Sequence, residues 1–251
     1  MNYAAITAKL KAMRSQLLSK TEYETLCNMK DTASLINCLK EKYAYQDMSN
    51  DLYRGLINAY NKDYLRISRY IYERPLIHFL KSVKGPTRDL SFYIKTWRLI
   101  NRLDKKNKLP MLRIFGTEID LLNIYLIYRL KTYYQVPNNS IYGYLLPMGY
   151  RLNPKSVTNM ITCENEKTLL NEVQLGPYKG VFIDFLNPEP ATSRATLKQY
   201  QRESLNYPHS LVPICCYLFE KETEIKNIQG IAAGITLGAK QNVIMNNLLQ
   251  I

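Results

Sequence analysis

The chain has 251 residues, of which 46% are hydrophobic, and it carries a formal net charge of +13. This apolar content is enough to bury one large core or two small ones, which excludes an intrinsically disordered protein. Only 10 Gly and 11 Pro are present, so the composition favours long helices over a β architecture with many turns, and we expect an all-α fold.

The first third of the chain predicts a series of amphipathic helices. In residues 3–18, apolar side chains recur at the four- and three-residue spacing of one helix face. Residues 19–22 have the form of a capping box, a hydroxyl followed three residues later by a carboxylate, which predicts the start of a short second helix. A third helix is expected from Asp31, and residues 48–83 are helical again, with a break or kink at Pro75.

The rest of the chain predicts further helices separated by polar or Pro- and Gly-containing breaks. The breaks are expected at residues 84–87, 104–110, 135–140 and 187–193. The helical segments are 88–103 and 116–134, short helices within 141–183, and two final helices at about 195–226 and 228–249, the first of them interrupted by Pro208 and Pro213.

The net charge is large enough to attract polyanions, anionic lipid heads or acidic protein surfaces, and charge alone does not choose among them. No stretch has the 18 to 20 uncharged apolar residues of a membrane span. The longest candidate, residues 119–134, contains Asp120, Asn123, Arg129 and Lys131. We therefore expect a helix buried in protein, within a soluble protein that can sit beside a membrane.

The residues that usually carry catalysis or bind metals are few. His78 and His209 lack metal-ligand spacing, and Cys215 and Cys216 are adjacent instead of forming C-x-x-C. No P-loop, G-x-G-x-x-G or G-x-S-x-G string is present. The sequence predicts no catalytic, metal or cofactor site. The odd number of cysteines and the lack of a signal-peptide pattern predict reduced thiols in the cytosol, at Cys27, Cys38, Cys163, Cys215 and Cys216.

An internal repeat relates residues 17–48 to residues 151–182 at an offset of 134. Leu18 falls on Leu152 in this alignment. One residue of slip brings Tyr45 onto Tyr178.

A second similarity joins two helices downstream of these segments. DLLNIYLI, from Asp120, matches EIKNIQGI, from Glu224, as acidic-x-x-Asn-Ile-x-x-Ile. Three residues apart on a helix, the carboxylate and the amide are neighbours, and they can cap backbone groups or meet a cation together.

We interpret these residues as a structural polar clasp inside an apolar helix, satisfying nearby chain ends or an arginine, with a catalytic carboxylate as the alternative. Loss of one member of a buried polar pair costs about 1–3 kcal/mol, which explains the pair without chemistry. The candidate clasp residues are Asp120, Asn123, Arg129, Glu224 and Asn227.

Several ordered strings resemble a known family. YAAITAKLKAMRSQLLSKTEYETL, GTEIDLLNIYLIYRLKTYY, IYGYLLPMGYRLNPKSVTNMI and EIKNIQGIAAGITLGAKQNVI look like parts of the central-stalk component of V-type and A-type ATPases that is called C in prokaryotes and d in eukaryotes. The resemblance implies a funnel of three similar helical lobes at the cytoplasmic face of the membrane. Such a protein binds the proteolipid ring and the foot of the central axle and has no active site of its own.

The chain departs from the family pattern in length, because members are usually longer and only two repeat fronts are visible. We expect a first helical lobe at 1–83, a remnant of a second lobe with the central buried helix at 84–140, and a third lobe at 141–251. About one lobe is missing at 83–90. The alternatives to a coupling subunit are a basic helical nucleic-acid-binding or adaptor module and an enzyme of unrecognised type.

Overall fold

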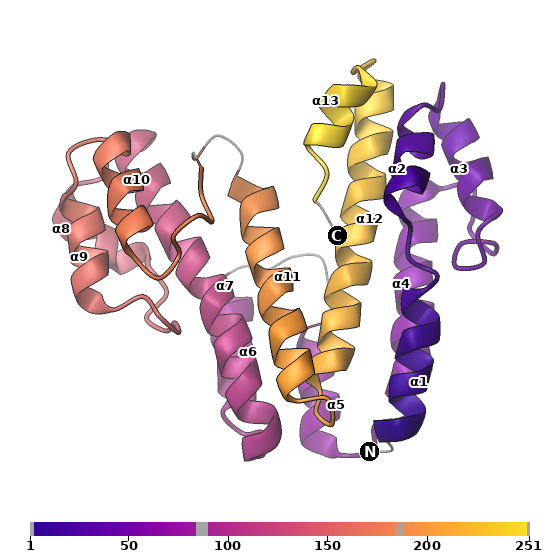
Figure 1. Cartoon of the computed structure of the whole chain (residues 1–251), viewed down its shortest axis with the longest axis horizontal. Coiled ribbons are helices and arrows are strands. Elements are labelled where there is room, and N and C mark those ends of the chain that lie inside the picture. The colour runs from indigo at the N-terminus through magenta and orange to yellow at the C-terminus, as the bar shows by residue number, and fades with distance from the viewer. Residues whose placement is uncertain (1–2, 84–89, 184, 186–187, 250–251) are drawn as a thin grey trace. The chain divides into compact units, whose positions relative to one another are not determined.

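The computed structural model describes residues 3–83, 90–183, 185 and 188–249, and every regular element among them is a helix (Figure 1). The expected all-α fold is therefore confirmed. The expected break at 84–87, and the position 83–90 at which we expect a lobe to be missing, fall largely on residues 84–89, which lie outside the described part of the chain.

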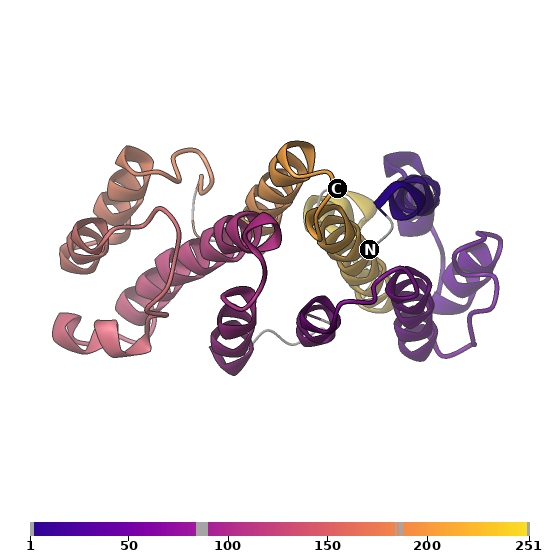
Figure 2. The same ribbon diagram turned by 90° about the horizontal axis from the view of Figure 1, so that it is seen from below.

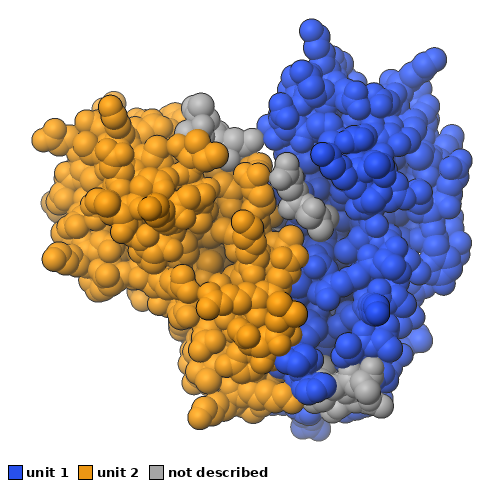
Figure 3. Space-filling view, in the orientation of Figure 1, with its two compact units in different colours: residues 1–80, 208–251 blue, residues 81–207 orange. Residues whose placement is uncertain are grey.

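Contacts between the helices divide the chain into two units (Figure 3). Unit 1 comprises residues 1–80 and 208–251, and unit 2 comprises residues 81–207. This division differs from the expected one, because the segment 141–251 is split between the units. The physical reason is that the last long helix packs against helices from the start of the chain.

Unit 1 is built around the long helix α12, Val212–Thr236, which contacts α1, α2, α3 and α4. The other helices of this unit are α1 Tyr3–Arg14, α2 Lys20–Cys27, α3 Thr32–Lys40, α4 Leu52–Ser68, α5 Arg74–Ser82, which ends two residues beyond the unit, and α13 Gln241–Asn246. Leu35, Leu56 and Ile228 are fully buried in its main apolar cluster. Two stretches far apart in the sequence therefore share one core.

Unit 2 is built around the long helix α7, Lys105–Thr132, which contacts α6, α9, α10 and α11. Figure 2 shows α6 and α11 lying beside α7. The other helices of this unit are α6 Leu90–Ile100, α8 Asn138–Ile141, a 3-10 turn at Tyr142–Tyr144, α9 Pro154–Thr162, α10 Glu166–Leu175 and α11 Pro188–Asn206. Ile127, Ile141 and Phe182 are buried in its main apolar cluster.

Three predicted helix boundaries are wrong, and proline and glycine explain them. Residues 104–110 are not a turn: α7 begins at Lys105 and contains Pro110. The N–H that Pro110 lacks would have bonded the carbonyl of Lys106, an exposed residue in the first turn, where water can replace it.

The second wrong boundary is the predicted loop at 187–193, since α11 begins at Pro188. A proline in the first turn of a helix loses no intrahelical bond. The third is the predicted break near residue 227, because α12 runs unbroken to Thr236. The chain turns only at Gly238, whose φ of 65° is a left-handed conformation that glycine adopts readily.

The predicted capping box at the start of α2 is present. Ser19 N donates to Glu22 Oε2 at 2.7 Å, and Glu22 N donates to Ser19 Oγ. Lys42 Nζ lies 2.5 Å from Glu22 Oε1. The bonds from Lys42 and from the Ser19 backbone lower the pKa of Glu22 from its ordinary 4.5 to about 2.

This lowered pKa predicts an acid-sensitive contribution to stability. Because Glu22 is more acidic in the folded state, its contribution is complete above pH 4.5 and is lost as the pH falls through about 2. At neutral pH we expect the free energy of unfolding of the wild type to exceed that of Glu22→Gln by at most about 1 kcal/mol, because the Glu22–Lys42 pair is partly solvated. Urea unfolding from neutral pH to pH 2 should show the difference between the two proteins shrinking; a difference at pH 2 as large as that at neutral pH contradicts the assignment.

Candidate functional site

Asp120 lies on α7 in unit 2, and its buried carboxylate is a hydrogen-bond acceptor for several groups of the unit. Its Oδ2 accepts four hydrogen bonds: from the N–H groups of Tyr150, Arg151 and Leu152 at 3.1, 2.7 and 3.0 Å, and from the Tyr178 hydroxyl at 2.6 Å. These donors lie before α9 and after α10. One carboxylate thus holds both ends of the short-helix segment against the long helix.

Asn123 lies one turn further along α7 and is also buried. Its Nδ2 donates to the Leu146 carbonyl at 3.0 Å, and its Oδ1 accepts from the Leu146 N–H at 2.9 Å. Both polar groups of Leu146 are satisfied by one side chain. We call Asp120 and Asn123, with the groups they bind, the Asp120 clasp.

Gly149 lies so close to this carboxylate that a side chain would not fit. A Cβ built on Gly149 would stand 2.0 Å from Asp120 Oδ1. The absence of a side chain at this position lets the loop reach the carboxylate, which is a close backbone approach of the kind that requires glycine.

Gly149→Ala is therefore expected to destabilise unit 2 by about 2–4 kcal/mol, through overpacking and weakened bonds to Asp120. Gly143→Ala is the matched control, because a Cβ at Gly143 meets nothing within 4 Å. Thermal unfolding followed by the fluorescence of Trp97, which packs against the cluster containing Ile119 and Leu146, measures the difference. Equal melting temperatures for the two variants contradict the proposed fit.

Glu224 on α12 has the role in unit 1 that Asp120 has in unit 2, and it is fully buried. Its Oε2 accepts from the Leu18 N–H at 2.5 Å, and its Oε1 accepts from the Tyr45 hydroxyl at 2.5 Å and from Lys221 Nζ at 2.6 Å. Lys221 is also buried, and its Nζ donates to the Tyr45 hydroxyl at 2.9 Å. A complete ion pair is thus enclosed in the core of unit 1.

Asn227 repeats the contacts of Asn123. Its Nδ2 donates to the Leu249 carbonyl at 2.6 Å, and its Oδ1 accepts from the Leu249 N–H at 2.7 Å. We call Glu224 and Asn227, with the groups they bind, the Glu224 clasp. Nearby, Arg14 Nε contacts Glu220 Oε2 at 2.7 Å, a second polar link between α1 and α12.

The two clasps are bound by residues that the internal repeat aligns. Leu18 and Leu152 each donate a backbone N–H to the carboxylate. Tyr45 and Tyr178 each donate a hydroxyl. The chain order differs, because in unit 2 these donors follow the clasp helix, whereas in unit 1 they come from the start of the chain. Glu224 therefore joins two distant parts of the sequence.

Burial raises the pKa of the Tyr178 hydroxyl, and the adjacent Asp120 carboxylate raises it further. The pKa of Tyr45 is raised for the same two reasons, with Glu224 as the neighbouring carboxylate. Both hydroxyls therefore stay protonated near neutral pH and act as hydrogen-bond donors to their carboxylates.

The structure places Arg129 outside the Asp120 clasp. Its guanidinium donates to the Tyr134 hydroxyl at 3.0 Å and lies over the rings of Tyr125 and Tyr134. Nine residues of α-helix separate it from Asp120, a rise of about 13 Å, which puts the carboxylate out of reach. The other four candidate residues make the clasp contacts described above.

Lys221 is the clasp residue that the sequence pattern did not identify. The signal was a lysine three residues before Glu224, but it lies in a strongly charged stretch with Glu220, Glu222 and Lys226. In the alignment of the clasp helices, Thr117 takes the place of Lys221. Glu224 thus has a buried counter-charge, whereas Asp120 is held by N–H and O–H donors.

A model of the family described as ATP synthase (C/AC39) subunit matches residues 87–247, well over half of the chain. The chain belongs to this family. It is similar to the C subunit of the A-type ATP synthase of Methanosphaera stadtmanae, with 25% identity over 176 residues, which cover 66% of this chain and 40% of that protein.

Two further C/AC39 relatives are likewise named as C subunits of A-type ATP synthases. The protein of Methanococcoides burtonii is 23% identical over 169 residues, covering 64% of this chain and 47% of the relative. The protein of Methanobrevibacter smithii is 27% identical over 137 residues, covering 51% of this chain and 35% of the relative. The matched part thus spans less than half the length of each of these relatives.

The other residues considered as candidate sites in this C/AC39 chain are histidines, cysteines and acidic side chains, which are residue types that can bind a metal. Among the described residues, no group of three or more His, Cys, Asp or Glu side chains could hold a metal ion. His78 and His209 are exposed, and all five cysteines are free of disulfides. In the part of the chain that the structure covers, no helix combines the length and apolarity that a membrane crossing requires.

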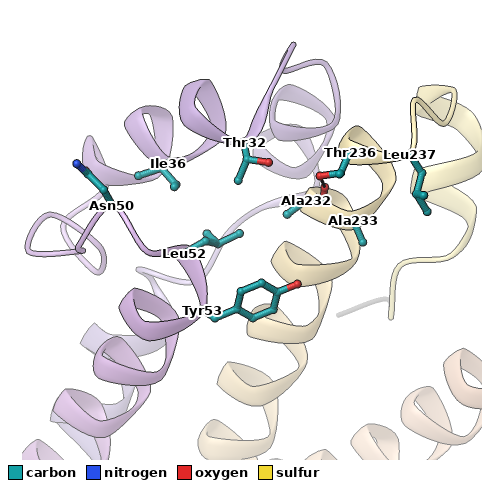
Figure 4. A pocket seen from close by; sticks show the side chains of 9 residues that line it. All are labelled: Thr32, Ile36, Asn50, Leu52, Tyr53, Ala232, Ala233, Thr236 and Leu237. Carbon is teal, nitrogen blue, oxygen red and sulfur yellow. Dashed lines mark hydrogen bonds between the residues drawn. The ribbon is translucent and has the colours of Figure 1, made fainter.

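A shallow pocket of about 540 Å³ lies in unit 1 between α3, the start of α4 and the end of α12 (Figure 4). Ala232 and Ala233 line it. In the clasp-helix alignment, Ala232 falls on Tyr128, whose ring stacks on Phe185 with centroids 4.4 Å apart. Unit 1 thus has a small side chain lining this pocket at the position where unit 2 has an aromatic one.

Proposed function

We propose that this protein is a non-catalytic coupling subunit of a rotary V/A-type ATPase, linking the membrane proteolipid ring to the central axle. The observation that carries the proposal is the family match over residues 87–247. In this role the protein would lie at the cytoplasmic face of the membrane, without a membrane span and without an active site of its own.

The two clasps support a mechanical role. Each fixes a segment of short helices onto a long helix through a buried carboxylate and a buried amide, and both amides bind a backbone N–H and carbonyl together. Satisfied buried networks of this kind rigidify a core. A protein that passes torque from a ring to an axle needs such rigidity.

The proposal is tested by binding. The full chain, mixed with the purified proteolipid ring in detergent and with the central-axle subunits of the same organism, should form a complex that survives size-exclusion chromatography. Binding to neither component contradicts the proposal. Complex formation is expected to weaken with added salt, because the basic chain would meet acidic groups on its partners.

The alternative of a nucleic-acid-binding module rests on the net charge alone. None of the contacts described above favours it. RNA binding is therefore measured as a competing outcome in the experiment that follows.

A further inference from the structure

A concentrated basic surface lies at one end of unit 2, where α6 turns into α7. Between residues 95 and 108 the sequence has six Lys or Arg residues and one acidic residue, Asp104. The six are Lys95, Arg98, Arg102, Lys105, Lys106 and Lys108, and we call them the basic end. Five of them are exposed and Lys108 is half-buried.

The helix contacts bring these cations together. Lys95 and Arg98 are three residues apart on α6 and so share one face, and α6 packs along α7 (Figures 1 and 2). Lys108 Nζ lies 3.4 Å from the Asn101 carbonyl, across the turn. These contacts place the cations of α6, of the turn and of the first turn of α7 at the same end of unit 2.

Exposed leucines accompany the cations. Leu109 follows Lys108 and is 37% exposed, and Leu205 in the last turn of α11 is 83% exposed. The ion pair between Arg113 on α7 and Glu203 on α11, at 3.3 Å, places the end of α11 beside the first turns of α7. Both leucines thus belong to the same end of unit 2 as the cations.

We propose that the basic end binds the surface of a membrane rich in anionic phospholipid, with its cations on the phosphate groups and Leu109 and Leu205 entering the interface. This inference rests on the proposed membrane-peripheral function. Charge complementarity to anionic headgroups supports it, because clusters of four to eight basic residues bind such surfaces. Exposed apolar side chains among the cations suit a lipid interface.

A single-stranded nucleic acid fits this surface less well. Proteins that bind single strands combine cations with aromatic side chains on which bases stack. The aromatic residue between positions 95 and 109 is Trp97, and it packs against the core cluster of unit 2 that contains Ile119. Leu109 and Leu205, the exposed leucines of this end, are aliphatic and offer no stacking platform.

The test is flotation of the full chain with phosphatidylcholine vesicles, with and without about 30 mol% phosphatidylglycerol. Wild type should bind only the anionic vesicles and be released in about 1 M salt, where the Debye length falls to about 3 Å. The variant K105Q/K106Q/K108Q should lose about 100-fold in partition coefficient. Leu109→Ser with Leu205→Ser should weaken binding while leaving its salt dependence unchanged.

The matched control is K155Q/K167Q/K179Q, which removes three exposed cations elsewhere in unit 2. It should retain vesicle binding within about threefold if the basic end is the contact. Equal loss in the two triple variants, equal binding to neutral vesicles, or tighter binding of a uridine-rich RNA through the same lysines overturns the proposal. The vesicles contain no other ATPase component, so failure here is distinct from failure to bind the ring or axle.

Discussion

Glu224→Ala is expected to lower the free energy of unfolding of unit 1 by about 3–5 kcal/mol. The substitution leaves the Lys221 ammonium buried without its carboxylate, 2.6 Å away in the wild type. It also removes the acceptor for the Leu18 N–H and the Tyr45 hydroxyl. The measurement is urea unfolding by far-UV circular dichroism, together with hydrogen exchange at the Leu18 amide, which should become faster.

A double variant separates the stranded charge from the lost acceptor. Lys221→Met with Glu224→Gln removes both charges but keeps a side-chain oxygen for one donor. Replacing both members of a buried pair costs less than removing one, so we expect this variant to be more stable than Glu224→Ala. If the double variant is less stable than Glu224→Ala, the unpaired Lys221 charge is not the cause of the stability lost in Glu224→Ala.

The control for unit 1 is Glu222 on the same helix. Glu222 Oε1 lies 3.5 Å from Lys226 Nζ, and the two side chains are 13% and 39% exposed, against 0% and 1% for Glu224 and Lys221. A pair with that much solvent contact contributes little, so Glu222→Ala should cost less than about 1 kcal/mol. A loss equal to that of Glu224→Ala means that general charge on α12, not the clasp, sets the stability.

Much of the clasp could be predicted because the chain contains its pattern twice. One acidic residue in an apolar helix carries little information, but the same acid and amide spacing at Asp120 and Glu224 indicated a shared structural need. The repeat also aligned Leu18 with Leu152 and Tyr45 with Tyr178, which are the donors in the structure.

Other parts of the site depend on contacts that a linear pattern does not contain. Gly149 lies in a turn where glycine has many explanations, and only the 2.0 Å approach to Asp120 identifies its role. Lys221 has the spacing of an ordinary surface pair, and its burial follows from the packing of Tyr45 over it. Arg129 shares the apolar helix with Asp120, but the helical rise between them keeps the two side chains apart.

Helix boundaries and the pairing of distant segments were the weakest predictions. Breaks were predicted at residues 104–110 and 187–193 because these segments contain proline. In both places the proline lies near the start of a helix, where its missing N–H is tolerated. The pairing of residues 208–251 with residues 1–80 depends on the fit of α12 against α1 and α4. Periodicity finds the buried face of a helix but does not identify the helix that covers it.

The pocket in unit 1 shows what one substitution within a repeat does. Where unit 2 has Tyr128 stacked on Phe185, unit 1 has Ala232 and an open hollow. The clasps, by contrast, keep their acid, amide and tyrosine in both units. We infer that the requirement for a clasp is stricter than the requirement for a filled surface, because a lost buried acceptor strands several donors at once.

Asp120→Ala is expected to destabilise unit 2 by about 3–5 kcal/mol. It removes the one oxygen that accepts hydrogen bonds from three backbone N–H groups and the Tyr178 hydroxyl, and so leaves these four donors without their acceptor. Tyr178→Phe removes one donor and leaves the carboxylate its three N–H partners, so its cost should be about 1 kcal/mol. Trp97 fluorescence during urea unfolding measures both changes in the unit that contains the clasp.

The double variant of Asp120→Ala and Tyr178→Phe tests whether the two groups act as one site. Because the hydroxyl bonds to Asp120 at 2.6 Å, removing both should cost less than the sum of the single changes, leaving a coupling energy of about 0.5–1 kcal/mol. Glu164→Ala, an exposed acid before α10, is the control and should change stability by under about 0.5 kcal/mol. Strict additivity, or a Leu152 amide that exchanges no faster in Asp120→Ala, would mean that the carboxylate does not fix the segment before α9 to the long helix.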